Sequence, residues 1–291
     1  MKYVAYFLGD FKAEFVANSL LDLCDSNVSF FTDFCCLQPF YHIHSMTHEE
    51  YYNHTEEIEK FLQQQDDLQV QYLEKGLITR HKSLVFLGDE LIQPLRLCSL
   101  TIQFVLFESA VKVNAEFEHQ VQRMQLIAGY LQGLFVSTDL ILEGNYIKAS
   151  ATLKQDYEIM ARLNEIHKGK SKYGKVPNPQ NGPLAMKKVY GYLNNIAHIS
   201  KHDILASLLL FRDCQNVEGI SPVKQIQEVF LKELIINDAL IKLEILRHCL
   251  ILHENLIGKD EIYNKGLIYW NVVIRLYGEC KDIIELLSKQ S

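Results

Sequence analysis

The chain has 291 residues and a formal net charge of −7, with 48% hydrophobic and 22% charged residues. This profile is typical of a globular protein of one or two domains, and the acidic balance argues against a protein that coats nucleic acid with its whole surface. Only 6 prolines and 14 glycines interrupt the chain. That scarcity favours long helices over a many-turned β fold and predicts an all-α, multi-helix bundle.

The sequence shows neither a signal peptide nor a membrane span. The apolar run at the N-terminus, MKYVAYFLGDFK, is short and soon reaches charged residues. Leu95–Val111 contains Arg96, Gln103 and Glu108, so it falls short of the roughly 20 apolar residues that cross a bilayer. Seven irregularly spaced cysteines favour reduced thiols over a disulfide framework. We therefore expect a cytoplasmic protein with no membrane contact.

The first third of the chain carries weak helical patterns. Ala13–Leu23 and Glu49–Leu73 are predicted helices, and the second has an outer face rich in Glu, Gln and Asp. The stretch SLTIQFVLF alternates well enough for a strand, although a helix is favoured. A boundary near residue 115 would separate an N-terminal helical region, 1–115, from a helical bundle with long C-terminal helices, 116–291.

The second part begins with a predicted helical hairpin. Phe117–Leu142 is amphipathic, Glu143-Gly144-Asn145 forms a turn, and Tyr146–His167 has apolar residues three and four apart. So short a turn predicts that the two helices pack antiparallel. A lysine-rich loop and a helix over Pro183–His198 follow.

Two long helices complete the chain. Ser221-Pro222 has the pattern of an N-cap followed by proline at the first helical position, and the apolar run continues to near Gly258. Its length predicts a kink near Asn237-Asp238. Ile262–Leu287 is a further periodic segment.

No metal or cofactor site is predicted. CCLQPFYHIHSMTH supplies Cys35, Cys36 and three histidines, but adjacent cysteines do not match the spacing of structural zinc sites. Glu116-x-x-His119 occurs once, whereas a di-iron bundle needs two such motifs. Phosphate-binding loops, dinucleotide fingerprints and nucleophile elbows do not occur, so no motif supports a small-molecule enzyme.

Positive charge is concentrated in one segment. Residues 166–190 contain no acidic residue and contribute +6, which leaves −13 on the rest of the chain. The segment is either an anion-binding loop or a solvated loop. In the first case its lysines would bind nucleic acid: Lys168, Lys170, Lys172, Lys175, Lys187 and Lys188.

Polar residues in YLNNIAHISKHD form the candidate site of chemistry. On a helix Asn194 and His198 share a face, with Lys187 two turns before and His202 one turn beyond. An imidazole beside an amide and lysines can bind a phosphodiester and move a proton near neutral pH. A solvent-facing polar strip is the alternative interpretation.

The helical hairpin, the loop and the Asn-x-x-x-His helix together resemble the HEPN-like helical bundles over residues 117–205. The resemblance implies a metal-independent ribonuclease that acts as a homodimer, with an Arg-Asn-x-x-x-His signature whose arginine holds the scissile phosphate. Here Asn194 and His198 match the signature, but Leu193 stands at the arginine position. Lys187, Lys188 or Arg162 could replace it, and Arg162 is the one expected as a catalytic residue. Arg162 with His167, and Arg247 with His253, also fit a looser Arg–His spacing.

The resemblance therefore predicts an RNA-binding or RNA-cleaving protein of stress response or defence, with no cofactor. Because leucine cannot hold a phosphate, we expect weak or absent catalysis. The alternative is a non-catalytic interaction protein that keeps the bundle and its dimer face.

Overall fold

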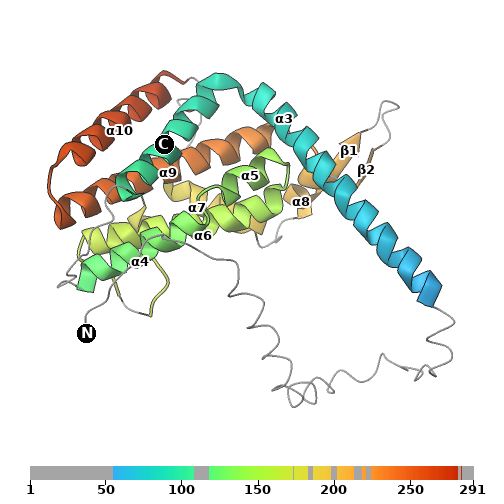
Figure 1. The fold of residues 1–291 in the computed structure, drawn as a ribbon, viewed down its shortest axis with the longest axis horizontal. Helices are drawn as coiled ribbons and strands as arrows, with labels where there is room; N and C mark the ends of the chain where they lie inside the picture. Colours follow the sequence, from blue (N-terminus) through green and yellow to red (C-terminus); the bar gives the residue numbers. More distant parts are fainter. Residues whose placement is uncertain are drawn as a thin grey trace, which may run out of the picture. The chain divides into compact units, whose positions relative to one another are not determined.

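The computed structural model describes residues 55–107, 118–172, 174–182, 186–197, 202–212, 218–220, 224–280 and 283. In these residues the protein is an all-α, multi-helix bundle (Figure 1), which confirms the predicted fold class. Residues 55–70 belong to one unit of the chain, and those from residue 71 onwards to another. The predicted helix Ala13–Leu23, the boundary near residue 115 and the cysteine–histidine stretch 35–48 lie outside the described residues.

Helix α3 (Thr55–Phe107) contains the predicted helix Glu49–Leu73 from residue 55 onwards and continues to Phe107. The stretch Ser99–Phe107 is helical rather than extended, as favoured from its sequence. Gly88 has φ 67° and ψ 176°, so it interrupts the helical backbone and bends α3 at this point. Only glycine adopts such a conformation without strain. Beyond the bend, Cys98, Ile102 and Val105 are fully buried in the core.

The predicted helix Phe117–Leu142 is two helices, α4 (Glu118–Gln132) and α5 (Val136–Leu142). A turn separates them, in which the Gly133 amide donates to Tyr130 and the Val136 amide donates to Gly133. Glycine is a weak helix former. The single-helix prediction is therefore wrong at this point.

Helix α6 (Tyr146–His167) has the predicted bounds and follows the predicted turn. Gly144, with φ 77°, lets the backbone turn sharply between α5 and α6. It also lies against the backbone of Gln225, where an added Cβ would meet the carbonyl oxygen at 2.5 Å. The Tyr146 hydroxyl accepts a hydrogen bond of 3.0 Å from the Gln227 amide. These contacts attach the segment before α9 to the corner of the hairpin.

Helix α6 is the centre of the bundle (Figure 1). It contacts α4, α5, α7 (Lys187–Ala197) and α9 (Glu228–Leu256), and α10 (Glu261–Glu279) packs against α9. The buried stripe of α6 consists of Leu153, Tyr157, Met160 and Leu163, each 0% exposed. Their three- and four-residue spacing places them on one face.

The remaining elements are short. Pro179–Asn181 is a 3-10 turn, η2, and α8 (His202–Leu209) precedes two three-residue strands, β1 (Leu210–Arg212) and β2 (Glu218–Ile220). The strands are antiparallel, with Phe211 opposite Gly219. This hairpin does not change the all-α architecture.

Helix α9 begins at Glu228, six residues later than the predicted start at Pro222, and the predicted cap lies outside the described residues. The helix runs without a break through Asn237-Asp238, so the predicted kink is wrong. Helix α10 begins after Asp260, whose carboxylate accepts from the Tyr263 amide at 2.8 Å. It ends at Glu279, and Cys280 follows in extended conformation. Of the remaining predicted helix to Leu287, only Ile283 is described, and it is helical.

A buried ion pair explains why α9 continues. Lys242 donates to both carboxylate oxygens of Asp238, at 2.5 and 2.6 Å, and to the Thr138 hydroxyl at 2.8 Å. The side chains of Lys242 and Asp238 are each 1% exposed. Asp238 is therefore paired inside the core and does not interrupt the helix.

Two helical stretches of the described chain, Glu59–Phe107 and His119–Leu142, contain windows long and apolar enough to span a membrane. Half of the first window and a third of the second are buried within the protein. Core helices pass the same test, so cytoplasmic localisation stays a prediction. Cys98, Cys249 and Cys280 are free and buried, as expected of reduced thiols.

Candidate functional site

The residues at the positions of the Arg-Asn-x-x-x-His signature differ in burial on α7. Leu193 is 0% exposed and lies in the same buried face as Val189 and Ile196. Asn194 is half-buried, and His198 lies outside the described residues. Because position 193 faces the interior, an arginine there could not reach a phosphate in solution. Leu193 therefore serves the core, and the resemblance to the HEPN signature stays a prediction.

Arg162 is bound within the loop that follows its own helix. Its guanidinium pairs with Glu165 at 2.6 Å, and it donates to the backbone carbonyls of Lys172 and Lys175. Glu165 in turn accepts from the Asn178 amide at 2.7 Å. Arg162 thus holds the lysine-rich loop in shape. These bonds involve both of its Nη atoms, and its role as a catalytic residue stays a prediction.

The predicted lysines present their side chains to solvent where the structure describes them. Lys168, Lys170, Lys172, Lys175 and Lys188 are exposed, while the side chain of Lys187 lies outside the described part. The Lys168 ammonium is 3.5 Å from the Asn181 carbonyl oxygen. Their role in binding nucleic acid stays a prediction.

A second group of cationic and imidazole side chains lies where α4, α6 and α9 meet. Arg123 of α4 approaches His167 at the end of α6, with 3.5 Å between the Arg123 Nη2 and His167 Nδ1 atoms. The His167 ring packs edge-on against His248 of α9, with centroids 6.1 Å apart. Arg247 lies beside His248, with 3.1 Å between Nη2 and Nε2. We call Arg123, His167, Arg247 and His248 the Arg–His cluster.

Arg247 is anchored by the polar residues around it. Its guanidinium donates two bonds to Glu244, at 2.8 and 3.0 Å, and one of 2.9 Å to the Asn164 side-chain oxygen. The side chain of Arg247 remains 28% exposed. Arg247 therefore has a fixed orientation, a paired charge and access to solvent.

Arg123 has no such partner. It is only 7% exposed, and its Nε atom has no hydrogen-bond partner. In the described part of the chain, no ion pair joins its guanidinium to a carboxylate, and His167 is its single hydrogen-bond partner. A buried cation without a counter-ion is costly. The cluster is therefore a place where an anion would be stabilised.

The imidazoles of the cluster are held neutral. Burial, followed by the charges of Arg247 and Arg123, lowers the pKa of His167 below its ordinary value. The same causes lower the pKa of His248 to about 3, and the buried Nδ1 atom of His248 has no hydrogen-bond partner among the residues that the structure describes. A guanidinium can only donate, so His167 Nδ1 accepts from Arg123 and the neutral ring carries its proton on Nε2. His167 is exposed and can donate this proton in a hydrogen bond to an incoming oxygen.

The arginines that lie next to the histidines of the cluster are not the ones that sequence spacing pairs with them. His167 was paired by spacing with Arg162, but its neighbours are Arg123 and Arg247. The other spaced pair, Arg247 and His253, is also separated: His253 is 1% exposed and its Nε2 lies 2.8 Å from the Asp260 carboxylate. Arg123 was missed altogether. Its only sequence signal is an arginine on the buried face of an amphipathic helix.

No group of three or more potential metal-ligating side chains occurs among the described residues. No family model, curated protein or solved structure matches the chain.

Proposed function

We propose that this chain is a HEPN-like cytoplasmic protein that binds RNA through its phosphates, with the Arg–His cluster as the phosphate site and weak or absent cleavage. The observation that carries the proposal is the buried guanidinium of Arg123, which has no carboxylate partner among the described residues and lies beside the exposed His167 imidazole. A phosphate would supply the missing negative charge and accept the Nε2 proton of His167. Arginine and imidazole donors are well suited to this task because they form charge-assisted bonds to phosphate oxygens.

The lysine-rich loop supports the assignment of a polyanion. Lys168 is close enough to His167 to lower its pKa further. Exposed lysines extend from this point through the loop, which Arg162 and Glu165 hold in place. A single-stranded RNA could then contact the cluster with one phosphate and the loop with its neighbours. On the basis of the resemblance to HEPN proteins, we propose a role in stress response or defence and a homodimer.

Binding is tested with a 5′-fluorescein-labelled single-stranded RNA, measured by fluorescence anisotropy. Arg123→Gln should weaken RNA binding about tenfold, because the charged hydrogen bond from the guanidinium to the phosphate is lost. Arg275→Gln removes the same charge from an exposed site on α10 and should change the affinity less than twofold. The logarithm of the binding constant should fall with the logarithm of salt concentration by about 0.7 for each phosphate contact. Equal affinities of the two variants, or binding that ignores salt, would contradict the proposal.

Cleavage is a separate question, tested with the same RNA in EDTA. Any metal-independent cleavage should yield 2′,3′-cyclic phosphate ends, stop in an RNA with 2′-deoxyriboses, and be lost in His198→Ala. If His198→Ala keeps its cleavage rate while Arg123→Gln loses it, the reaction belongs to the Arg–His cluster.

The alternative, a non-catalytic interaction protein, is favoured by the first part of α3. Large apolar side chains are exposed there, including Phe61 at 70%, Leu68 at 64% and Leu77 at 64%. Exposed apolar helix surfaces are typical of binding sites for proteins. If RNA does not bind, and Leu68→Lys converts a self-associating protein to a monomer in light scattering, this function is preferred.

A further inference from the structure

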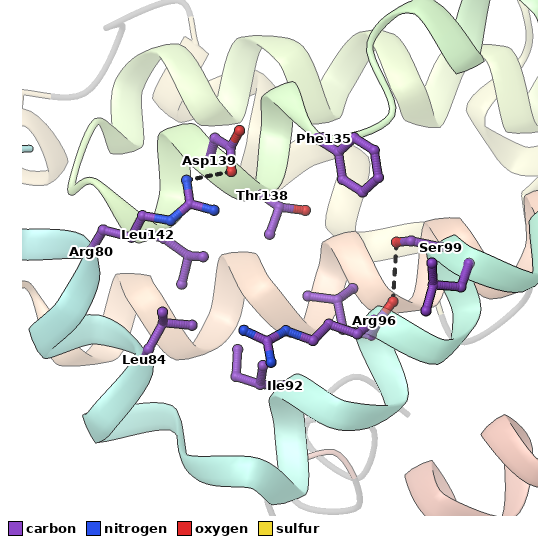
Figure 2. A pocket seen from close by; sticks show the side chains of 11 residues that line it. Arg80, Leu84, Ile92, Arg96, Ser99, Phe135, Thr138, Asp139 and Leu142 are labelled. Atoms are coloured by element: carbon purple, nitrogen blue, oxygen red, sulfur yellow. Dashed lines mark hydrogen bonds and ion pairs between the residues drawn. The ribbon is translucent and has the colours of Figure 1, made fainter. Parts of the chain in front are cut away.

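A separate cavity of about 320 Å³ lies between α3 and α5 (Figure 2). Both arms of α3 line it, because the bend at Gly88 separates Arg80 and Leu84 from Ile92 and Leu95. Phe135, Thr138, Asp139 and Leu142 close it from the α5 side. Its volume is at the lower end of the range of small-molecule pockets.

The lining is mainly apolar. Ile92, Leu95 and Leu142 form a buried part, each no more than 5% exposed. Phe135 and Leu100 are 49% and 60% exposed and lie at the rim. An apolar group of a ligand would therefore lose contact with water on entering, which favours binding.

One charged residue of the lining, the exposed Arg96, has no protein partner in the described part of the chain. The hydroxyls of Ser99 and Thr138 already donate to Leu95 and Asp238, and Arg80 is paired with Asp139 at 2.6 Å. No hydrogen bond or ion pair occupies the Arg96 guanidinium among the described residues, and Figure 2 shows it extended into the space between Leu84 and Ile92. Two arginines and one aspartate also give the cavity a net positive charge.

We propose that this cavity binds a small amphipathic anion, a monocarboxylate whose apolar body lies on Ile92, Leu95 and Leu142 and whose head pairs with Arg96. The arrangement follows from the free guanidinium above an apolar surface, since a carboxylate matches its bidentate donors. The site uses none of the residues of the Arg–His cluster and does not depend on RNA binding.

The test uses 1-anilinonaphthalene-8-sulfonate, a fluorescent amphipathic anion, displaced by three ligands with the same octyl body. Octanoate should displace the dye, 1-octanol should do so about tenfold less well, and octylammonium should be weaker still. Arg96→Gln should weaken octanoate about tenfold and leave octanol unchanged within twofold. Phe135→Ala should weaken both, because it removes part of the rim that covers the apolar body.

Arg275→Gln serves as the control for loss of charge. Variants are compared only if their thermal midpoint equals that of the wild type. The proposal is overturned if octanoate and octanol bind equally, or if Arg96→Gln and Phe135→Ala both leave the displacement unaltered. Neither variant would alter the displacement if the dye were bound on the exposed part of α3 instead of in the cavity. The proposal is supported if Arg96→Gln weakens the binding of octanoate and leaves the binding of 1-octanol unchanged.

Discussion

Replacing Arg123 with methionine tests whether its guanidinium is kept for a ligand rather than for the fold. The residue is 7% exposed and its charge is unpaired among the described residues. Desolvation of such a charge lowers the free energy of unfolding, because no partner offsets it. Methionine fills similar space without charge. We therefore expect Arg123→Met to make the protein more stable, although it removes a functional residue.

The magnitude follows from two opposing effects. Removing a fully buried, unpaired cation relieves several kcal/mol, but this cluster reaches solvent at His167, which reduces the gain. The bond to His167, at 3.5 Å, is long and contributes about 1 kcal/mol at most. The expected net increase is about 1–3 kcal/mol.

The same substitution at Lys242 should act in the opposite direction. Lys242 is 0% exposed and its ammonium contacts both oxygens of Asp238. Lys242→Met leaves that carboxylate buried with only Thr138 as a donor. We expect a loss of about 3–5 kcal/mol.

Urea denaturation at pH 7, in buffer free of phosphate and sulfate, measures both variants. Arg275→Met, at an exposed site, should change stability by no more than about 0.5 kcal/mol. Phosphate should then stabilise the wild type by about 2.7 kcal/mol at one hundred times its dissociation constant, and Arg123→Met by only about 1.4 kcal/mol at the same concentration, since we expect binding to weaken about tenfold. The reasoning is refuted if Arg123→Met loses as much stability as Lys242→Met, because the guanidinium would then serve the fold.

Three further predictions follow from the titrating groups and from one glycine. Arg123→Gln should raise the His167 pKa toward its ordinary value of 6.5, as read from the NMR shift of the ring proton against pH; an unchanged value would remove Arg123 from the cluster. Burial raises the pKa of Asp156 to about 6, because the folded protein favours the neutral carboxyl. The resulting stabilisation is fully present below about pH 3.8 and is lost as the pH rises through 6 and the carboxyl ionises. Asp156→Asn should therefore stabilise the protein by about 3 kcal/mol at pH 8 and by almost nothing at pH 3 in urea denaturation, and a gain independent of pH would contradict this. Gly144→Ala should lower the free energy of unfolding by about 1–3 kcal/mol, because φ is 77° and the new Cβ would meet the backbone of Gln225. A thermal midpoint equal to that of the wild type would show that the turn has another conformation.

Local sequence determined much of the fold. The apolar residues of α6 are spaced three and four apart, which predicts a helix. The Gly144 turn before it and the lysine-rich loop after it predict its bounds at Tyr146 and His167. Few prolines and glycines were enough to predict an all-α bundle. These features depend on neighbours three or four residues away, which a sequence displays directly.

Tertiary structure decided what spacing could not. Asn237-Asp238 reads as a helix interruption, yet Asp238 is paired with Lys242 and Thr138, and Thr138 is 100 residues away. The Arg–His cluster likewise joins Arg123 to His167 and places Arg247 nearby from a third helix. Whether an arginine is solvated or buried without a partner depends on which helices enclose it. That enclosure is a property of packing over long sequence separations, and no local pattern records it.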